Sequence, residues 1–243
     1  LLSRLDLTAL GWSLRQVHFP DSSATLDRAV RRLKFDELLV LQLRVALARR
    51  EFTQAQAPAI PFDAERTKTL IAGFGFTLTD DQRKAAWQIL QDLGQPRPMN
   101  RLLEGEVGSG KTAVVAVAAG GVAAAGYQSV FLAPTDLLAR QHGTTLVRLL
   151  ARAGLRVGLL TRTAATLDGQ EVTRPQLLKR LAAGSVDVCT GTHALLEEKV
   201  KFANLALAVV DEQHRFGVQQ RATLRAKAGE GSPHFLSLSA TPI

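Results

Sequence analysis

The most constraining feature of this chain is a glycine-rich segment at residues 105–112, which reads Gly-Glu-Val-Gly-Ser-Gly-Lys-Thr. It matches the phosphate-binding pattern G-x-x-x-x-G-K-[ST] at every fixed position. The glycines let the backbone curl until its N–H groups point at phosphate oxygens, the lysine reaches the β- and γ-phosphates, and the threonine hydroxyl is a ligand for Mg²⁺. The alternative is a Gly/Ser turn beside an unrelated lysine. The motif predicts a site for ATP and Mg²⁺ that contains Gly105, Gly108, Ser109, Gly110, Lys111 and Thr112.

Strand-like and helix-like runs alternate around this segment, as the motif requires. A strand-like run at 101–104 precedes it, and the apolar run 113–119 reads as a helix whose N-terminal dipole favours a bound anion. A capping-box signature at 79–82 opens another helix, which runs to about Leu93. Such alternation predicts an α/β fold, with a parallel sheet and helices on both faces. The predicted strands are 101–103, 129–132, 157–160, 186–190, 205–210 and 235–238, with further helices at 137–150 and 175–183.

The first 60 residues follow a different pattern. Residues 24–52 contain neither glycine nor proline, and Ser22 or Ser23 can cap the start of this stretch. Its leucines and arginines predict one long or two consecutive amphipathic helices. A connection that contains Pro58 and Pro61 then leads into the alternating part. We therefore expect two regions, a helical segment at 1–60 and an α/β domain at 61–243.

A buried strand that ends in two acids provides the second half of a nucleotide site. The run 205–210 is wholly apolar and is followed by Asp211 and Glu212. Burying two carboxylates at the end of a buried strand costs free energy unless a cation or another partner pairs with them. A Mg²⁺ ion on the phosphates would be such a partner. Asp211 is then expected to hold Mg²⁺, and Glu212 to orient and deprotonate the attacking water. The alternative is that both are acids at the N-terminus of the next helix.

Composition limits the remaining classes of function. The formal charge of +8, from 30 basic and 22 acidic residues, is compatible with a polyanionic partner, and equally with a generally arginine-rich composition. A single cysteine, Cys189, rules out an internal disulfide and a thiolate metal cluster, and its apolar neighbours predict burial.

The longest uncharged stretch, 112–135, is interrupted by glycines and Pro134, so we expect no membrane span. No signal peptide is evident, which makes a cytoplasmic protein the expectation.

The acidic strand end also carries a family resemblance. Asp-Glu-x-His after a phosphate loop resembles the superfamily 2 helicases and translocases, and the string Asp-Glu-Gln-His-Arg-Phe-Gly-Val-Gln-Gln-Arg at 211–221 is similar to the RecG DNA helicases. The related coupling-factor translocase usually has a second acid at Gln213. The matching strings cover most of the chain. They are found at 14–20, 31–38, 98–103, 133–135, 141–142, 191–195 and 239–243.

The resemblance implies roles for residues outside the phosphate loop. Gln82 corresponds to the glutamine that reads the adenine edge, and Phe76 is placed to stack on the base; Gln82 also fits a simple capping-box partner. Backbone N–H groups, hydroxyls and helix N-termini can contact DNA phosphates without reading sequence; for Thr135 and Thr192 the alternative is helix capping. The implied DNA-binding residues are Pro134, Thr135, Arg140, Gly191, Thr192 and His193, and those implied to couple ATP state to DNA grip are Gln213, His214, Ser239 and Thr241.

The same resemblance implies the architecture and the partners. The chain resembles the first RecA-like lobe of a P-loop NTPase motor, preceded by a helical linker from a wedge domain. A second RecA-like lobe with arginine fingers and the wedge itself are expected in the same protein. The implied function is an ATP-dependent DNA helicase or duplex translocase that remodels branched double-stranded DNA, namely stalled forks and Holliday junctions. Glu106 and the string Thr161-Arg162-Thr163 depart from the family pattern.

Two rival functions follow from the same residues. One is another superfamily 2 translocase, of the coupling-factor or primosomal type, against which Gln213 and the Pro-Met-Asn string at 98–100 argue. The other is a nucleotide-gated DNA-binding module without catalysis, which would not need Glu212.

Overall fold

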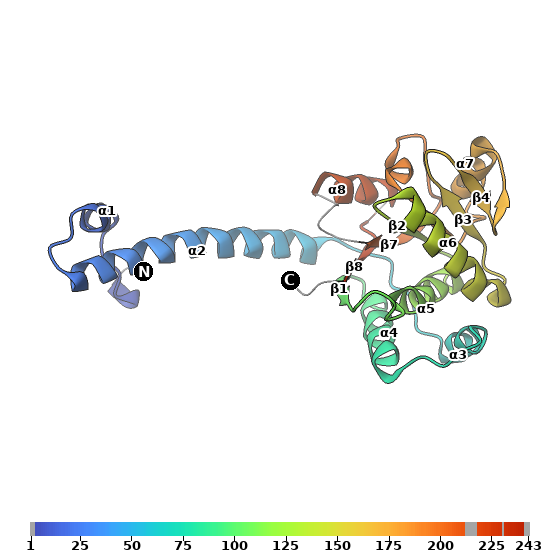
Figure 1. The fold of residues 1–243 in the computed structure, drawn as a ribbon, viewed down its shortest axis with the longest axis horizontal. Helices are drawn as coiled ribbons and strands as arrows, with labels where there is room; N and C mark the ends of the chain where they lie inside the picture. Colours follow the sequence, from blue (N-terminus) through green and yellow to red (C-terminus); the bar gives the residue numbers. More distant parts are fainter. Residues whose placement is uncertain (1–2, 212–217, 230, 241–243) are drawn as a thin grey trace. The chain divides into compact units, whose positions relative to one another are not determined.

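The chain divides into two compact units. The computed structural model describes residues 3–211, 218–229 and 231–240. The units are Leu1–Gln54 and Ala55–Ile243, and Figure 1 shows the elements of each. The assignment of these regions to a linker and a first motor lobe remains a prediction.

The N-terminal unit is helical. A short 3-10 turn, η1 (Ser3–Leu5), and helix α1 (Leu10–His18) precede α2 (Ser23–Gln54), which is one continuous helix rather than two. The hydroxyl of Ser22 accepts a hydrogen bond from the backbone N–H of Thr25 at 3.2 Å, so Ser22 caps α2. Helices α1 and α2 pack together, and the Arg28 guanidinium lies 5.9 Å from the centre of the Trp12 ring.

The second unit alternates strands and helices around one sheet (Figure 1). Within the described residues the sheet has 8 strands in the order β1-β8-β7-β2-β6-β3-β4-β5, and the first six of these are parallel. All six predicted strands are present. The strands are β1 (Asn100–Glu104), β2 (Gln128–Leu132), β3 (Val157–Leu160), β4 (Ala165–Leu167), β5 (Gln170–Glu171), β6 (Val188–Gly191), β7 (Leu205–Asp211) and β8 (His234–Ser239). The helices are α3 (Ala64–Ala72), α4 (Asp80–Leu93), α5 (Lys111–Ala124), α6 (Asp136–Leu150), α7 (Arg174–Ala182) and α8 (Val218–Lys227), with 3-10 turns η2 (Ala151–Ala153) and η3 (His193–Leu196).

The predicted parallel sheet is extended at one side by two antiparallel strands that the sequence analysis did not predict. Strands β4 and β5 form an antiparallel hairpin that extends β3. Its two-residue turn is Asp168-Gly169, with φ of 51° and 81°, which is the geometry that Asp-Gly favours in tight hairpins. The Asp168 carboxylate also accepts a hydrogen bond from the backbone N–H of Val157 at 2.7 Å. The turn is therefore tied to the start of β3.

Helices cover both faces of the sheet, as predicted. Successive residues of a strand face opposite sides, so β3 identifies the two layers. Leu159 packs with Ala139 of α6, whereas a side chain at Gly158 would meet Leu177 of α7. Helix α5 packs on β2 and β7 and is flanked by α3, α4 and α6. Cys189 of β6 is buried, as predicted, and among the described residues no helix combines the length and apolar character needed to cross a membrane.

A buried glutamine joins the strands at the edge opposite the motifs. The Gln128 side chain donates to the carbonyl oxygens of Leu181 and Val186 at 3.1 and 2.8 Å. It also accepts from the backbone N–H groups of Ala203 and Asn204 at 2.7 and 3.1 Å. The Gln128 amide thus donates two hydrogen bonds and accepts two, which is all that it can make. These bonds connect β2 to the segments that lead into β6 and β7.

Candidate nucleotide and DNA site

The predicted motifs meet at one edge of the sheet because the strands that carry them are parallel. In the register of the sheet, Glu104 pairs with Ser239, Asp211 with Leu238, and Leu132 with Val210. The strands β1, β8, β7 and β2 therefore end at the same level. Ligands bind beyond the carboxyl ends of strands in sheets of this kind.

The phosphate loop lies at this edge between β1 and α5. Its first residue, Gly105, donates its backbone N–H to the carbonyl oxygen of Ser239 at 3.2 Å, which ties the loop to the end of β8. Gly110 immediately precedes α5 and has a φ of 82°, so the chain turns sharply into the helix at a position that disfavours a side chain. The loop therefore meets the N-terminus of α5, where unpaired N–H groups and the helix dipole favour an anion.

Lys111 is held within the loop. Its ammonium donates to the carbonyl oxygens of Gly105 at 2.5 Å and Glu106 at 3.0 Å. These bonds use two of the three ammonium donors and place the positive charge at the loop itself. A phosphate at the N-terminus of α5 would therefore meet a cation beside the backbone N–H groups.

The Gln82 side chain caps helix α4 and also contacts the phosphate loop. Its side-chain oxygen accepts from the backbone N–H of Thr79 at 2.9 Å, and the Thr79 hydroxyl accepts from the N–H of Gln82 at 3.3 Å. This is the reciprocal capping box that the sequence indicates. The Gln82 amide also donates to the carbonyl oxygen of Ser109 at 2.8 Å. Contact with adenine stays a prediction, as does stacking by Phe76, whose side chain is exposed.

The two predicted Mg²⁺ ligands share a partner that sequence reasoning missed. Nδ1 of His142 lies 3.2 Å from the Thr112 hydroxyl, and Nε2 of the same ring lies 3.0 Å from Oδ2 of Asp211. The ring packs on Phe131, with centroids 4.4 Å apart and planes inclined by 32°. The sequence showed His142 only as part of a family string, and no spacing rule links it to residues 30 and 69 positions away.

These residues fit a magnesium ion held jointly by protein and phosphate. Within the described part of the chain, no group of three or more His, Cys, Asp or Glu side chains could hold a metal by itself. Mg²⁺ usually binds through one or two carboxylates together with substrate phosphates and water. A hydroxyl at the start of α5 and a carboxylate at the end of β7, both within reach of one imidazole, match that mode of binding.

The predicted DNA-contacting residues lie along the same edge, on the strands that follow. Strand β2 leads into Pro134 and Thr135, and the Thr135 hydroxyl caps α6 by accepting from the N–H of Leu138 at 3.3 Å. Arg140 donates to Asp136 at 2.7 Å and to the Thr163 hydroxyl at 3.2 Å. The bond from Arg140, together with bonds from threonine hydroxyls, lowers the pKa of Asp136. The Thr-Arg-Thr segment after β3 is thus joined to the start of α6.

The neighbouring strand β6 adds a second turn. Gly191 ends β6 and accepts from the N–H of Ala133 at 2.8 Å, which joins the two turns by backbone. Thr192 precedes η3 without a side-chain capping bond, so the capping alternative holds for Thr135 and not for Thr192. His193 begins η3. Whether these turns touch DNA stays a prediction.

Some predicted site residues cannot be placed. Glu212, Gln213, His214 and Thr241 lie outside the described residues. Of the four coupling residues, only Ser239 is described, and its carbonyl holds the phosphate loop.

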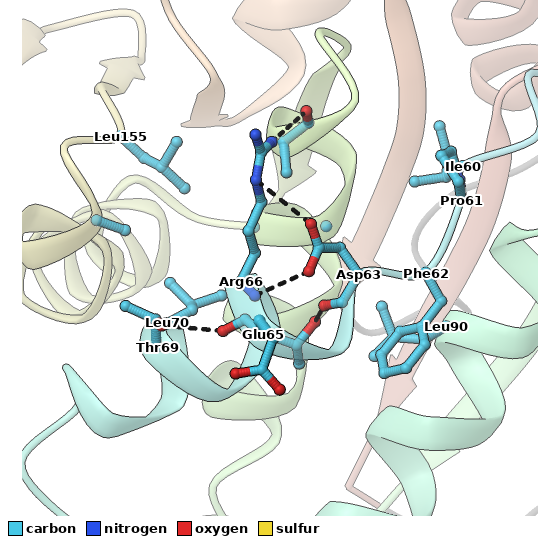
Figure 2. Close-up of a pocket in the computed structure, with 15 residues that line it drawn as sticks. Ile60, Pro61, Phe62, Asp63, Glu65, Arg66, Thr69, Leu70, Leu90 and Leu155 are labelled. Carbon is cyan, nitrogen blue, oxygen red and sulfur yellow. Dashed lines mark hydrogen bonds and ion pairs between the residues drawn. The ribbon is translucent and has the colours of Figure 1, made fainter.

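A separate apolar pocket of about 470 Å³ lies at the other end of α5 (Figure 2). It is lined by Leu70, Leu90 and Leu155, and by Gly120 and Gly121 near the end of α5. At its rim the Arg66 guanidinium donates to the carbonyl oxygen of Ala124 at 3.2 Å and pairs with the Asp63 carboxylate at 3.4 Å, as Figure 2 shows. The pocket residue Gly120 lies more than two helical turns after Lys111 on α5, and a helix rises about 1.5 Å per residue. This pocket is therefore separate from the phosphate loop and is not the nucleotide site.

Comparison with known proteins agrees with the geometry. The family model of the DEAD/DEAH box helicases matches residues 79–243, which include the capping box, the phosphate loop and the acidic strand end. The chain belongs to the DEAD/DEAH box helicase family. Membership of this family implies nucleotide binding, typically together with a divalent metal.

Among DEAD/DEAH box helicases, the chain is similar to RecG over its whole length, which confirms the predicted resemblance. It is 43% identical to the ATP-dependent DNA helicase RecG of Synechocystis sp. over 241 residues, covering 99% of this chain and 28% of the relative. It is 41% identical to RecG of Bacillus subtilis, over 95% of this chain and 33% of the relative. The chain thus spans about a third of the length of these relatives.

Two solved structures are also similar to this chain. The structure of RecG bound to a three-way DNA junction matches with a TM-score of 0.83 and 33% identity, over 100% of this chain and 32% of that one. The structure of Mss116p bound to ssRNA and AMP-PNP matches with a TM-score of 0.57 and 18% identity, over 75% of this chain and 39% of that one. At that identity the second match supports the fold alone. The predicted RecA-like α/β lobe is confirmed, apart from the antiparallel edge hairpin.

Proposed function

We propose that this chain is the ATP-binding lobe of an ATP-dependent DNA helicase or duplex translocase that remodels branched DNA, such as stalled forks and Holliday junctions, in recombination and repair. The observation that carries the proposal is the joint placement of Thr112 and Asp211 beside the phosphate loop. The turns after β2, β3 and β6 lie next along the same edge. One side of the lobe thus offers a nucleotide site and a strip of sequence-independent phosphate contacts.

Each residue of the nucleotide site has a stated role in this proposal. Lys111 and the loop N–H groups bind the β- and γ-phosphates. Thr112 and Asp211 would hold Mg²⁺, which would neutralise negative charge that develops on the phosphates during transfer. Glu212 orients the attacking water and accepts its proton. Gln82 and Phe76 contact the base.

Branched DNA is the proposed substrate because the similar RecG structure is bound to a three-way DNA junction. The strip formed by Pro134, Thr135 and Arg140, together with the turn at 191–193, would hold phosphates through N–H groups, hydroxyls and one guanidinium. Such contacts allow movement along any sequence. We place the protein in the cytoplasm, where it meets DNA.

The nucleotide site is proposed to be one half of a complete site. A second RecA-like lobe of the same protein would supply arginine fingers, and a wedge domain would split the junction. An arginine finger is worth about 10³–10⁵ in rate, so we expect this chain to bind ATP and to hydrolyse it poorly.

The test is Mg²⁺-dependent ATP hydrolysis in the presence of forked DNA, with Glu212→Gln as the matched variant. We expect negligible turnover by this chain and strong turnover by the protein that includes the second lobe. Glu212→Gln should abolish that turnover while nucleotide binding is retained. Strong turnover by this chain alone would contradict the half-site, and full activity of Glu212→Gln would contradict the catalytic role.

A further inference from the structure

His142 stands between two side chains that come from different elements. Thr112 belongs to the first turn of α5 and Asp211 ends β7, whereas His142 lies in the middle of α6. The side chains of His142 and Asp211 are only 17% and 14% exposed. The imidazole is therefore enclosed, and both of its nitrogens lie within hydrogen-bond distance of residues assigned to the metal site.

The donors and acceptors in this chain of bonds follow from chemistry. An ionised carboxylate only accepts, so Nε2–H of His142 donates to Asp211. In the neutral ring Nδ1 then accepts, which requires the Thr112 hydroxyl to donate its proton. A threonine that donates its only proton to Nδ1 keeps its oxygen lone pairs for a cation. The same ring thus contacts both the hydroxyl and the carboxylate that are predicted to bind Mg²⁺.

We propose that His142 is a positioning residue that sets Thr112 and Asp211 in the orientation needed to hold Mg²⁺. The proposal rests on the proposed function, because it takes those two residues as the metal ligands. In this role His142 would act through Thr112 and Asp211 and would not itself bind the metal or the nucleotide. Groups that hold metal ligands in this way commonly change metal affinity by about 10–100-fold when removed.

Packing alone does not account for a histidine here. The ring lies on Phe131, and a phenylalanine at position 142 could keep that apolar contact. Only an imidazole, or a side chain with both a donor and an acceptor, can also serve Thr112 and Asp211. The variants His142→Phe and His142→Gln separate the two roles, because the first keeps an aromatic ring and the second keeps a donor and an acceptor.

The experiment measures binding of a fluorescent ATP analogue to this chain, in EDTA and across a Mg²⁺ titration. Binding of Mn²⁺ in the presence of ADP, followed by electron paramagnetic resonance, gives a direct metal readout. We expect His142→Phe to raise the half-saturating Mg²⁺ concentration by about 10–100-fold while affinity in EDTA stays at the wild-type value. His142→Gln should recover part of the loss. Thr144→Ala, an exposed change on the same helix, should match wild type.

Three results would overturn the proposal. Wild-type Mg²⁺ dependence in His142→Phe would remove the positioning role and leave the proposed function standing. An equal loss of affinity in EDTA and in Mg²⁺ would assign His142 to general structure. Failure of the wild-type chain to bind the analogue at all would overturn the proposed function and this inference with it. If His142→Phe does not fold, as judged by its circular dichroism melt, the Mg²⁺ dependence of His142→Gln decides. A raised half-saturating Mg²⁺ concentration with wild-type affinity in EDTA supports the positioning role, whereas a wild-type Mg²⁺ dependence, or a loss as large in EDTA as in Mg²⁺, contradicts it.

Discussion

The side-chain amide of Gln82 donates a hydrogen bond to the carbonyl oxygen of Ser109 at 2.8 Å. The same amide closes the capping box of α4 through Thr79. The start of α4 is therefore fastened to the phosphate loop by one side chain. A change in the conformation of the phosphate loop on nucleotide binding would therefore alter the hydrogen bonds at the N-terminus of α4.

Replacement of Gln82 by Ala should weaken both stability and nucleotide binding. Loss of a helix cap costs about 1 kcal/mol, and the loop carbonyl of Ser109 would also lose its partner. We expect lower affinity for ATP, measured by titration of a fluorescent analogue. Thr79→Ala is the matched control, because it removes the other half of the capping box and should reduce stability by a similar amount with ATP affinity unchanged. Equal ATP affinities for Gln82→Ala and wild type would contradict the proposed contact.

Replacement of Arg140 by Ala should weaken DNA binding without regard to sequence. Removal of one phosphate contact lowers the slope of log affinity against log salt by about 1. The measurement is fluorescence anisotropy of a labelled three-way junction at several salt concentrations. Arg148→Ala carries the same change in charge at an exposed position in the last turn of α6. If both variants shift the slope alike, net charge rather than the strip explains the binding.

Two adjacent residues of β2 should respond oppositely to loss of their polar groups. Gln128→Leu removes four hydrogen bonds to backbone groups and should lower the free energy of unfolding by about 3 kcal/mol or more. In the described structure the buried Ser129 hydroxyl has no hydrogen-bond partner, so Ser129→Ala should be neutral or stabilising by roughly 1 kcal/mol. Urea unfolding measures both, with Gln170→Leu on exposed β5 as the control for the first. A marked loss of stability in Ser129→Ala would mean that the hydroxyl is satisfied.

A buried histidine should make stability depend on pH. Nδ1 of His234 accepts from the backbone N–H of Met99 at 3.0 Å, and Nε2 lies 2.8 Å from the carbonyl oxygen of Pro58. Burial lowers the pKa of His234 below its ordinary value of 6.5, and the Pro58 bond and the charge of Asp92 only partly oppose this. The neutral ring therefore belongs to the folded state.

The sign follows from proton binding. Below about pH 6.5 the unfolded chain takes up a proton at His234 that the folded chain does not, so folding stability falls as the pH falls towards the folded pKa. Urea unfolding between pH 7.5 and 5.5 should show this loss, and His234→Gln should reduce the slope. His18→Gln changes an exposed histidine and should leave the slope as in wild type. An unchanged slope in His234→Gln would rule out this residue as the cause.

Local features of the chain were predictable because short-range rules govern them. The phosphate loop, the capping box at Thr79 and the apolar strand before Asp211 each depend on a few consecutive residues. The hairpin at Asp168-Gly169 also carried a usable signal, since Asp-Gly is the strongest dipeptide for a tight hairpin. It was missed because β4 and β5 are too short to show alternation.

The sequence by itself determined which chemical groups this chain carries: the phosphate-loop motif, the Thr112 hydroxyl that follows it and the acid at the end of a buried strand. Only the tertiary structure decided which of these groups meet and through what. The strand order β1-β8-β7-β2 brings Asp211 beside the loop, and α6 then brings His142 between Asp211 and Thr112. These contacts join residues far apart in the chain, and the packing of whole strands and helices sets them, whereas periodicity and motif spacing report only on near neighbours.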